Sequence, residues 1–174
     1  MANLVLTVMG SDRPGLTQAL SSAVLSAGGN WLESHLSQLA GLYVGSTLVE
    51  IDEAKVEALL EAVRAVDAEG LDVRIAPASQ RAGGLGDAVG FNLVGQDRPG
   101  IVHQVTATLA RLGVNIETFK SFLTPEPHSG AQLFHIDARL RLPAGMSSAA
   151  VQAELEAISG EIMVDVALSP LDAA

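Results

Sequence analysis

Two short segments of the chain repeat the same residue types at the same spacing. Residues 10–15 read Gly-Ser-Asp-Arg-Pro-Gly and residues 95–100 read Gly-Gln-Asp-Arg-Pro-Gly; an asparagine follows each copy at the same distance, as Asn30 and Asn115. An ionised aspartate accepts hydrogen bonds from an ammonium group, and an asparagine both donates and accepts. The pattern therefore predicts a binding site for a small zwitterion such as an α-amino acid, present twice.

Each motif lies between an apolar run that predicts a strand and an amphipathic segment that predicts a helix. The apolar runs are Leu4–Met9 and Val89–Val94. The first N–H groups of a helix have no partner within it, and the helix dipole stabilises an anion there by about 0.3–1 kcal/mol. Gly15 and Gly100 let a ligand approach the backbone closely. A ligand carboxylate is thus expected at the helix start.

The candidate ligand-binding residues are the repeated motif positions and the two asparagines: Gly10, Asp12, Arg13, Pro14, Gly15, Asn30, Gly95, Asp97, Arg98, Pro99, Gly100 and Asn115. Structural alternatives stay open for the polar residues. The aspartates can instead cap the helix or pair with the arginines that follow them, and the asparagines can occupy turns with positive φ. Arg13 and Arg98 fit surface or structural charges better than ligand contacts.

Hydrophobic periodicity predicts the helices that follow the motifs. Pro14 and Pro99 fit the first helical turn, where the missing N–H costs nothing. Gly28 and Gly113 are expected to end the helices in the left-handed conformation. The buried faces are expected to hold Leu16, Leu20, Ala23, Val24 and Ala27 in the first helix, and Ile101, Val105, Leu109 and Leu112 in the second.

The remainder of each copy predicts two strands, another helix and a last strand. Asp52 and Ser147 are the expected N-caps of these helices. The expected strands are 31–39, 43–51 and 71–76 in the first copy, and 134–142 and 161–168 in the second. In 134–142 apolar and polar residues alternate, as in an antiparallel strand with one buried face. The order β-α-β-β-α-β occurs twice, which predicts an α+β fold of two ferredoxin-like units, each a four-stranded antiparallel sheet with helices on one face.

The expected domain boundaries follow from the repeat. Residues 1–78 form the first expected domain, residues 88–174 the second, and the glycine-rich segment 79–87 a linker between them. A chain of 174 residues has room for two such domains.

Composition restricts the functional classes. The net charge of −10 opposes binding to a nucleic-acid backbone, which needs clustered Lys and Arg. There is no long apolar stretch for a membrane span, and no signal peptide is visible after Met1, so a cytoplasmic location is expected. Without cysteine there is no thiolate nucleophile, and the four histidines lack metal spacing. We therefore expect no catalytic residues, metal or cofactor.

The unit of strand, Gly-x-Asp-Arg-Pro-Gly, helix, Gly-x-Asn, hairpin, helix and strand resembles the ACT domain, a small ligand-sensing module of amino-acid metabolism. Two such units without another domain resemble the glycine cleavage system transcriptional repressor group. The resemblance implies a non-enzymatic regulator that senses a small amino acid, glycine or serine-like, and modulates a regulatory protein partner. The setting that it implies is transcriptional control of amino-acid (glycine) metabolism. It also implies a homodimer.

The family pattern places further constraints on the site. In serine-binding ACT domains an asparagine stands at the position of Asp12 and Asp97, and a histidine two places earlier, where this chain has Gly10 and Gly95. The resemblance also implies that the ligand lies where the motif loop of one unit faces the strand edge of a neighbouring unit. A tandem chain can build such sites within itself or between subunits. Two alternatives remain open: a structural oligomerisation module without ligand, and a regulatory fragment related to ACT-containing enzymes such as formyltetrahydrofolate deformylase.

Overall fold

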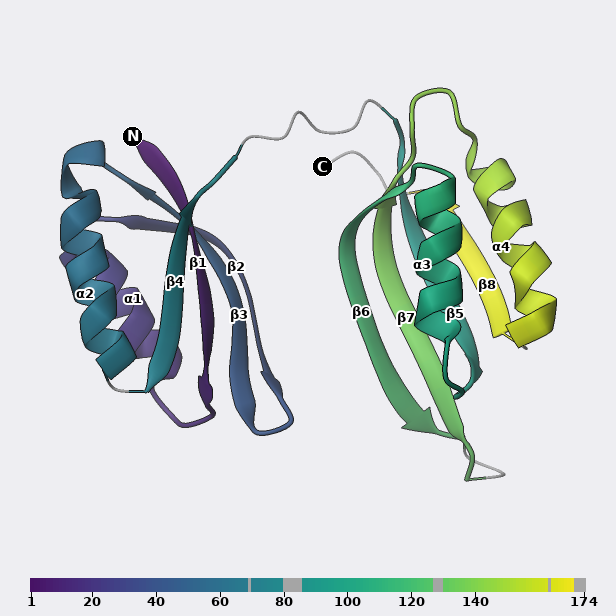
Figure 1. Ribbon diagram of the computed structural model, residues 1–174, viewed down its shortest axis with the longest axis horizontal. Helices are drawn as coiled ribbons and strands as arrows, with labels where there is room; N and C mark the ends of the chain where they lie inside the picture. Colours follow the sequence, from purple (N-terminus) through teal and green to yellow (C-terminus); the bar gives the residue numbers. More distant parts are fainter. Residues whose placement is uncertain (69, 80–85, 127–129, 163, 171–174) are drawn as a thin grey trace. The chain divides into compact units, whose positions relative to one another are not determined.

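The computed structural model describes residues 1–68, 70–79, 86–126, 130–162 and 164–170 of the chain. The chain divides into two compact units, Met1–Arg81 and Ala82–Ala174 (Figure 1). Most of the expected linker 79–87 lies outside the described residues. No helix in the described part of the chain is long and apolar enough to cross a membrane.

The first unit has the order β-α-β-β-α-β, with a 3-10 turn (Glu53–Lys55) before its second helix. Its elements are β1 (Ala2–Ser11), α1 (Leu16–Ser26), β2 (Asn30–Leu39), β3 (Leu42–Ile51), α2 (Val56–Ala68) and β4 (Leu71–Pro77). The four strands form one antiparallel sheet in the order β2-β3-β1-β4, so that β2 is an edge strand.

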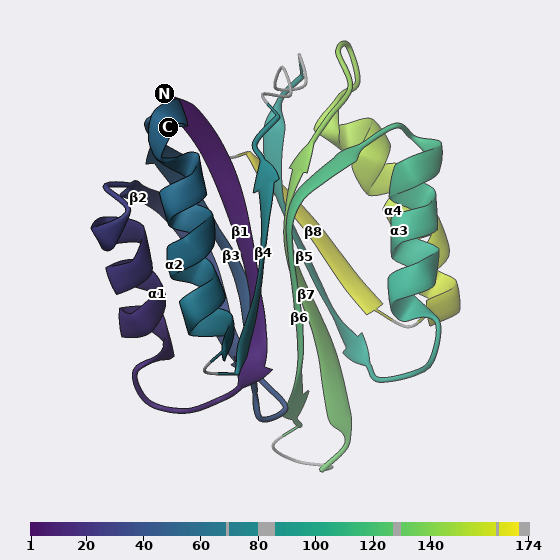
Figure 2. The same cartoon turned by 60° about the vertical axis from the view of Figure 1, so that its left-hand side comes forward.

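The second unit repeats this arrangement. Its elements are β5 (Ala88–Gln96), α3 (Ile101–Arg111), β6 (Asn115–Pro125), β7 (Gln132–Arg141), α4 (Ser148–Ile162) and β8 (Val164–Pro170). The sheet order is β6-β7-β5-β8, again antiparallel, with β6 at an edge. In each unit the two helices cover one face of the sheet (Figure 2). The predicted α+β fold of two ferredoxin-like units is confirmed.

Each unit has its own hydrophobic core between its helices and the covered face of its sheet. Alternate residues of the central strands point into it, such as Leu4, Leu6 and Val8 in β1. The predicted face of α1 is buried completely, and that of α3 is buried except for Leu112, which is half-buried. Burial of these apolar faces stabilises each unit by roughly 25 cal/mol per Å² of apolar surface removed from water.

The ends of the helices confirm several predictions from sequence. Gly28 and Gly113 adopt φ of 76° and 69°, and the amide after each glycine donates to a carbonyl inside the helix, as in a Schellman motif. The Asp52 carboxylate accepts from the amide of Ala54 at 3.0 Å, and the Ser147 hydroxyl accepts from Ala150 at 3.2 Å. Asp52 caps the 3-10 turn that leads into α2.

One boundary differs from the prediction. The last strand was expected at residues 161–168, but α4 continues to Ile162 and β8 begins at Val164. Gly160 lies within α4, where a glycine costs only about 1 kcal/mol relative to alanine. The helical turns on either side of Gly160 therefore extend through it.

Candidate functional site

The backbone of each motif loop is set by its last glycine. Gly15 adopts φ 94° and ψ −4°, and Gly100 adopts φ 97° and ψ −8°. These are the angles of the third residue of a type II turn, which follows a proline and requires glycine. The helices begin one residue later, so the prediction that Pro14 and Pro99 lie in the first helical turn is wrong. Each proline instead precedes the N-cap and belongs to the turn.

The surface over the two N-cap glycines is open. A Cβ atom built on Gly15 or Gly100 would meet no other atom within 4 Å. Gly10, at the start of the first motif, is different, because a Cβ there would lie 2.6 Å from the carbonyl oxygen of Gly70. The last glycine of each motif therefore leaves space for a ligand, whereas Gly10 is required by the close approach of β1 to the segment before β4.

Each motif loop is fixed to the hairpin of its own sheet. The amide of Asp12 donates to the carbonyl of Gly41 at 3.0 Å, and the amide of Asp97 donates to that of Gln132 at 3.0 Å. Gly41 lies in the β2–β3 turn, and Gln132 begins β7. Both aspartates have exposed side chains. The backbone of the loop is thus anchored while the carboxylates face solvent.

The structural alternatives for the aspartates find little support. Gly15 and Gly100 are the N-cap residues of α1 and α3, so neither aspartate is at the N-cap, and neither helix start has a side-chain cap hydrogen bond. Among the described residues, no ion pair is recorded for Asp12 or Asp97. Arg98 is half-buried, and its Nε atom is buried without a hydrogen-bond partner among the described residues.

The two asparagines lie far from the motif loops of their own units. Asn30 pairs with Glu50, which pairs with Asn3 near the beginning of β1, whereas the motif follows the end of β1. At about 3.3 Å per residue, the length of β1 separates the two ends of the sheet by more than roughly 20 Å. In the second unit Asn115 pairs with Arg141 at the corresponding end. Neither unit alone brings its aspartate and its asparagine together.

Both asparagines begin edge strands, and their side chains are exposed. The alternative of a turn with positive φ does not hold for them, because Ala40 is the one non-glycine residue with positive φ in the described part of the chain. Ala40 and Gly41 form the two-residue turn between β2 and β3, with φ of 50° and 84°. Such turns require positive φ at both positions.

A surface pocket of about 320 Å³ opens beside Asn30. It lies where the outer side of α1 meets the start of β2, and its lining is Ser21, Ser22, Val24, Leu25, Gly29, Asn30 and Trp31. The residue pattern did not predict that α1 contributes to this pocket. The sequence signal that could have indicated this pocket is Leu25, an exposed apolar residue near Ser21 and Ser22 on the polar side of the amphipathic helix.

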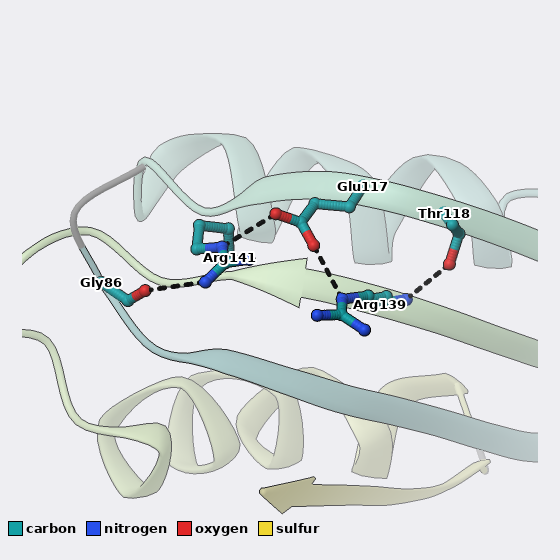
Figure 3. Close-up of polar contacts among 5 residues, drawn as sticks. All are labelled: Gly86, Glu117, Thr118, Arg139 and Arg141. Atoms are coloured by element: carbon teal, nitrogen blue, oxygen red, sulfur yellow. Dashed lines mark hydrogen bonds and ion pairs between the residues drawn. The ribbon is translucent and has the colours of Figure 1, made fainter. Parts of the chain in front are cut away.

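A cluster of charges lies beside Asn115 (Figure 3). The carboxylate of Glu117 accepts from Nε of Arg139 at 2.9 Å and from Nε of Arg141 at 2.8 Å. Arg141 also donates through Nη1 to the carbonyl of Gly86 at 3.2 Å, and Thr118 accepts from the amide of Arg139 at 3.2 Å. The hydrogen bond from Arg141 is the largest contribution that holds the pKa of Glu117 below its usual value, with a further contribution from Arg139.

Glu117 reaches both arginines because β6 is irregular at this point. The register between β6 and β7 shifts between Ile116 and Thr118, so Glu117 has no direct partner on β7. A bulge of this kind redirects the extra side chain. The shift recurs between Trp31 and Glu33 in the first unit. The alternating pattern predicted the solvent-facing positions of Arg139 and Arg141 but gave no signal for the bulge.

Comparisons with known proteins agree with this architecture. Residues 2–76 match the family model of the ACT domain. A crystal structure of a protein from Galdieria sulphuraria is 26% identical and covers 98% of both chains, with a TM-score of 0.86.

A second crystal structure, of a protein assigned as a glycine cleavage system transcriptional repressor, is 19% identical. It covers 98% of this chain and 97% of its own, with a TM-score of 0.70. No curated protein sequence gave a significant match. Residues 2–76 are therefore similar to the ACT domain, and because the second unit repeats the same topology, the chain has a tandem ACT-like architecture.

Proposed function

We propose that the protein is a non-enzymatic regulator that binds a small amino acid, glycine or serine-like, and modulates a regulatory protein partner. The observation that carries the proposal is the repeated motif loop. In each unit a helix begins at an open glycine beside an exposed aspartate. Free N–H groups at the helix start favour a carboxylate, and the aspartate favours an ammonium group.

The proposed sites lie between copies of the chain. Since the aspartate and the asparagine of one unit occupy opposite ends of its sheet, a complete site needs the asparagine of another unit. The long edge strands β2 and β6 carry backbone groups that can pair with a second copy. We therefore propose a homodimer in which the motif loop of one chain faces Asn30 or Asn115 of its partner.

The class of partner follows from charge and from the comparisons. The net charge of −10 opposes direct binding to DNA, so we propose that regulation takes place through another protein. The similar structure assigned as a glycine cleavage system transcriptional repressor supports transcriptional control of amino-acid metabolism as its setting. A cytoplasmic location belongs to the same proposal.

The test is a thermal-shift panel of the twenty amino acids on the full chain, followed by calorimetry on the ligands that raise Tm. Ligand at 100 times its Kd should add about 2.7 kcal/mol of stability. Asp12→Ala, Asp97→Ala, Asn30→Ala and Asn115→Ala should weaken binding at the sites that are used. Asp52→Ala is the matched control for the motif-loop variants, because it removes a helix-cap hydrogen bond at the opposite end of the first sheet and should lower Tm without lowering affinity at the loops.

Two outcomes would contradict the proposal. Unchanged affinity in all four variants would place the ligand outside the motif loops and asparagines. If no amino acid raises Tm or gives heat on titration, the oligomerisation module without ligand becomes the better description.

A further inference from the structure

The residues directly opposite the two asparagines carry opposite charges. Glu50 stands directly opposite Asn30, whereas Arg141 stands directly opposite Asn115. Residues in this relationship lie on the same face of the sheet, with their Cβ atoms about 4.5–5.5 Å apart. A ligand group held by the asparagine would therefore meet a carboxylate in the first unit and a guanidinium in the second.

The neighbouring positions extend this difference. Arg139 stands opposite Thr118 on β6, while Leu48 stands opposite the equivalent residue Glu33 on β2. Two cations therefore flank the asparagine end in the second unit, and an apolar and an acidic residue flank it in the first. Glu117 neutralises one of the two arginines, so Arg139, Arg141 and Glu117 together keep one net positive charge.

The arginines retain donors for another anion. A guanidinium has five N–H donors in a planar fork that matches a carboxylate. Arg139 donates through Nε to Glu117, and 38% of its side chain is exposed. In Figure 3 the two terminal nitrogens of Arg139 point away from Glu117. Arg141 is held on two sides, by Glu117 and by the carbonyl of Gly86, which fixes its orientation.

We propose that Arg139, Arg141 and Asn115 form a carboxylate-binding site in the second unit, and that Glu50 excludes a carboxylate from the corresponding end of the first. The inference rests on the proposed function in assigning this site to a carboxylate of the amino-acid ligand. In a glycine- or serine-like ligand that group is the α-carboxylate, which the facing motif loop of the proposed dimer also contacts. The side-chain carboxylate of an acidic amino acid is the alternative that the calorimetry below distinguishes. The end of the sheet at Asn115 then binds a carboxylate, whereas the end at Asn30 does not.

The first experiment uses acetate, which carries the carboxylate alone. The full chain is titrated with sodium acetate, with sodium chloride at matched ionic strength as reference, and the side-chain amide and arginine Nε signals are followed by ¹H–¹⁵N NMR. The Asn115 amide and both arginine Nε signals should shift and saturate with acetate, and the Asn30 amide should not. Equal responses of Asn30 and Asn115, or responses to chloride that match those to acetate, would overturn the inference.

Variants assign the effect to the arginines. Arg141→Gln and Arg139→Gln should each weaken acetate binding at Asn115 about tenfold or more, the scale of a lost charge-assisted hydrogen bond. Arg139→Gln leaves the contact with Gly86 in place, so it provides the test if Arg141→Gln does not fold. Arg111→Gln is the matched control, because Arg111 forms an ion pair with Glu154 at 2.7 Å between α3 and α4. An equal loss in the Arg111 variant would overturn the inference.

Calorimetry with glycine and with L-aspartate separates the two sources of the carboxylate. Weaker glycine binding in the arginine variants identifies the α-carboxylate, and an effect on L-aspartate alone identifies the side-chain carboxylate. Unchanged binding of both ligands, with Asp97→Ala still effective, overturns the inference and leaves the proposed function standing. Acetate binding at Asn115 without any amino-acid binding supports the inference and contradicts the proposed function.

Discussion

Asp12 and Asn30 lie at opposite ends of one sheet. The amide of Asp12 is bonded to the carbonyl of Gly41 in the β2–β3 turn, whereas Asn30 begins β2 at the far end of the same hairpin. Helix α1 lies between the two in the sequence. One rigid unit therefore cannot bring both residues to the same small ligand, and the role proposed for them requires a second unit.

A mixing experiment tests whether the sites form between chains. A chain with Asp12→Ala and Asp97→Ala and a chain with Asn30→Ala and Asn115→Ala should each bind amino acid weakly. Random exchange at equal amounts makes half of the dimers mixed, and each mixed dimer has intact loops facing intact asparagines at half of its sites. Mixing should therefore restore about one quarter of the binding capacity, measured by calorimetry after subunit exchange. Restored capacity should also fall on dilution, because ligand and dimer are linked by mass action. A mixture as inactive as its components would contradict sites between chains.

Glu117 should make stability depend on pH. Its pKa is lowered in the folded protein, first by the hydrogen bond from Arg141. A lowered pKa contributes stability at pH values above the unfolded pKa, and this contribution is lost as pH falls through the folded pKa. Between about pH 6 and about pH 3, the stability of wild type should thus fall more than that of Glu117→Gln, which cannot titrate there.

The measurement is urea unfolding at a series of pH values. Like Glu117→Gln, Arg141→Gln should make the loss of stability at low pH smaller than in wild type, because it removes the main cause of the lowered pKa of Glu117. Parallel curves for wild type and Glu117→Gln would show that this carboxylate does not contribute.

Ala40 should be replaceable with a gain in stability. It adopts φ of 50° in the β2–β3 turn, where an L-residue other than Asn, Asp or Gly costs about 1–2 kcal/mol. Ala40→Asn should raise the unfolding free energy by about 0.5–1 kcal/mol, since Asn-Gly is favoured in this turn. Ala40→Val should lower it, because a β-branched residue fits positive φ poorly. The two variants, compared by thermal unfolding, should move Tm in opposite directions.

Thr47 is a second site for stabilisation. Its side chain is 1% exposed in the first core, and its hydroxyl has no hydrogen-bond partner among the described residues. Thr47→Val keeps the shape and removes the unpaired group, so the unfolding free energy should rise by about 1 kcal/mol. Thr108→Val in α3 is the matched control and should bring no comparable gain, because its hydroxyl is not an orphaned buried group. A loss of stability in Thr47→Val would indicate that its hydroxyl is hydrogen-bonded.

The repeat and the hydrophobic pattern predicted the fold well, because strands and helices with one buried face follow local rules. The left-handed conformation at Gly28 and the caps at Asp52 and Ser147 are likewise encoded within a few residues. Site geometry depends on sheet register instead. Sequence spacing placed Asn30 near its motif, but pairing with Glu50 places it at the other end of the sheet.

Similarly, residue pattern alone could not reveal the charge cluster of the second unit. Arg139 and Arg141 were predicted to face solvent, but their common contact with Glu117 arises from a bulge in the neighbouring strand. A bulge changes which residues meet without changing hydrophobic alternation along either strand. The cluster therefore emerged only from three-dimensional pairing.

The contact at Gly10 limits how this binding site can change during evolution. Serine-binding ACT domains resemble this motif but carry a histidine at that position, and here even a methyl group would meet the Gly70 carbonyl oxygen at 2.6 Å. Acquiring the histidine would first require β4 and the segment before it to move. A side chain at position 10 is therefore accommodated only together with a change in the backbone around Gly70, so the two positions have to vary together.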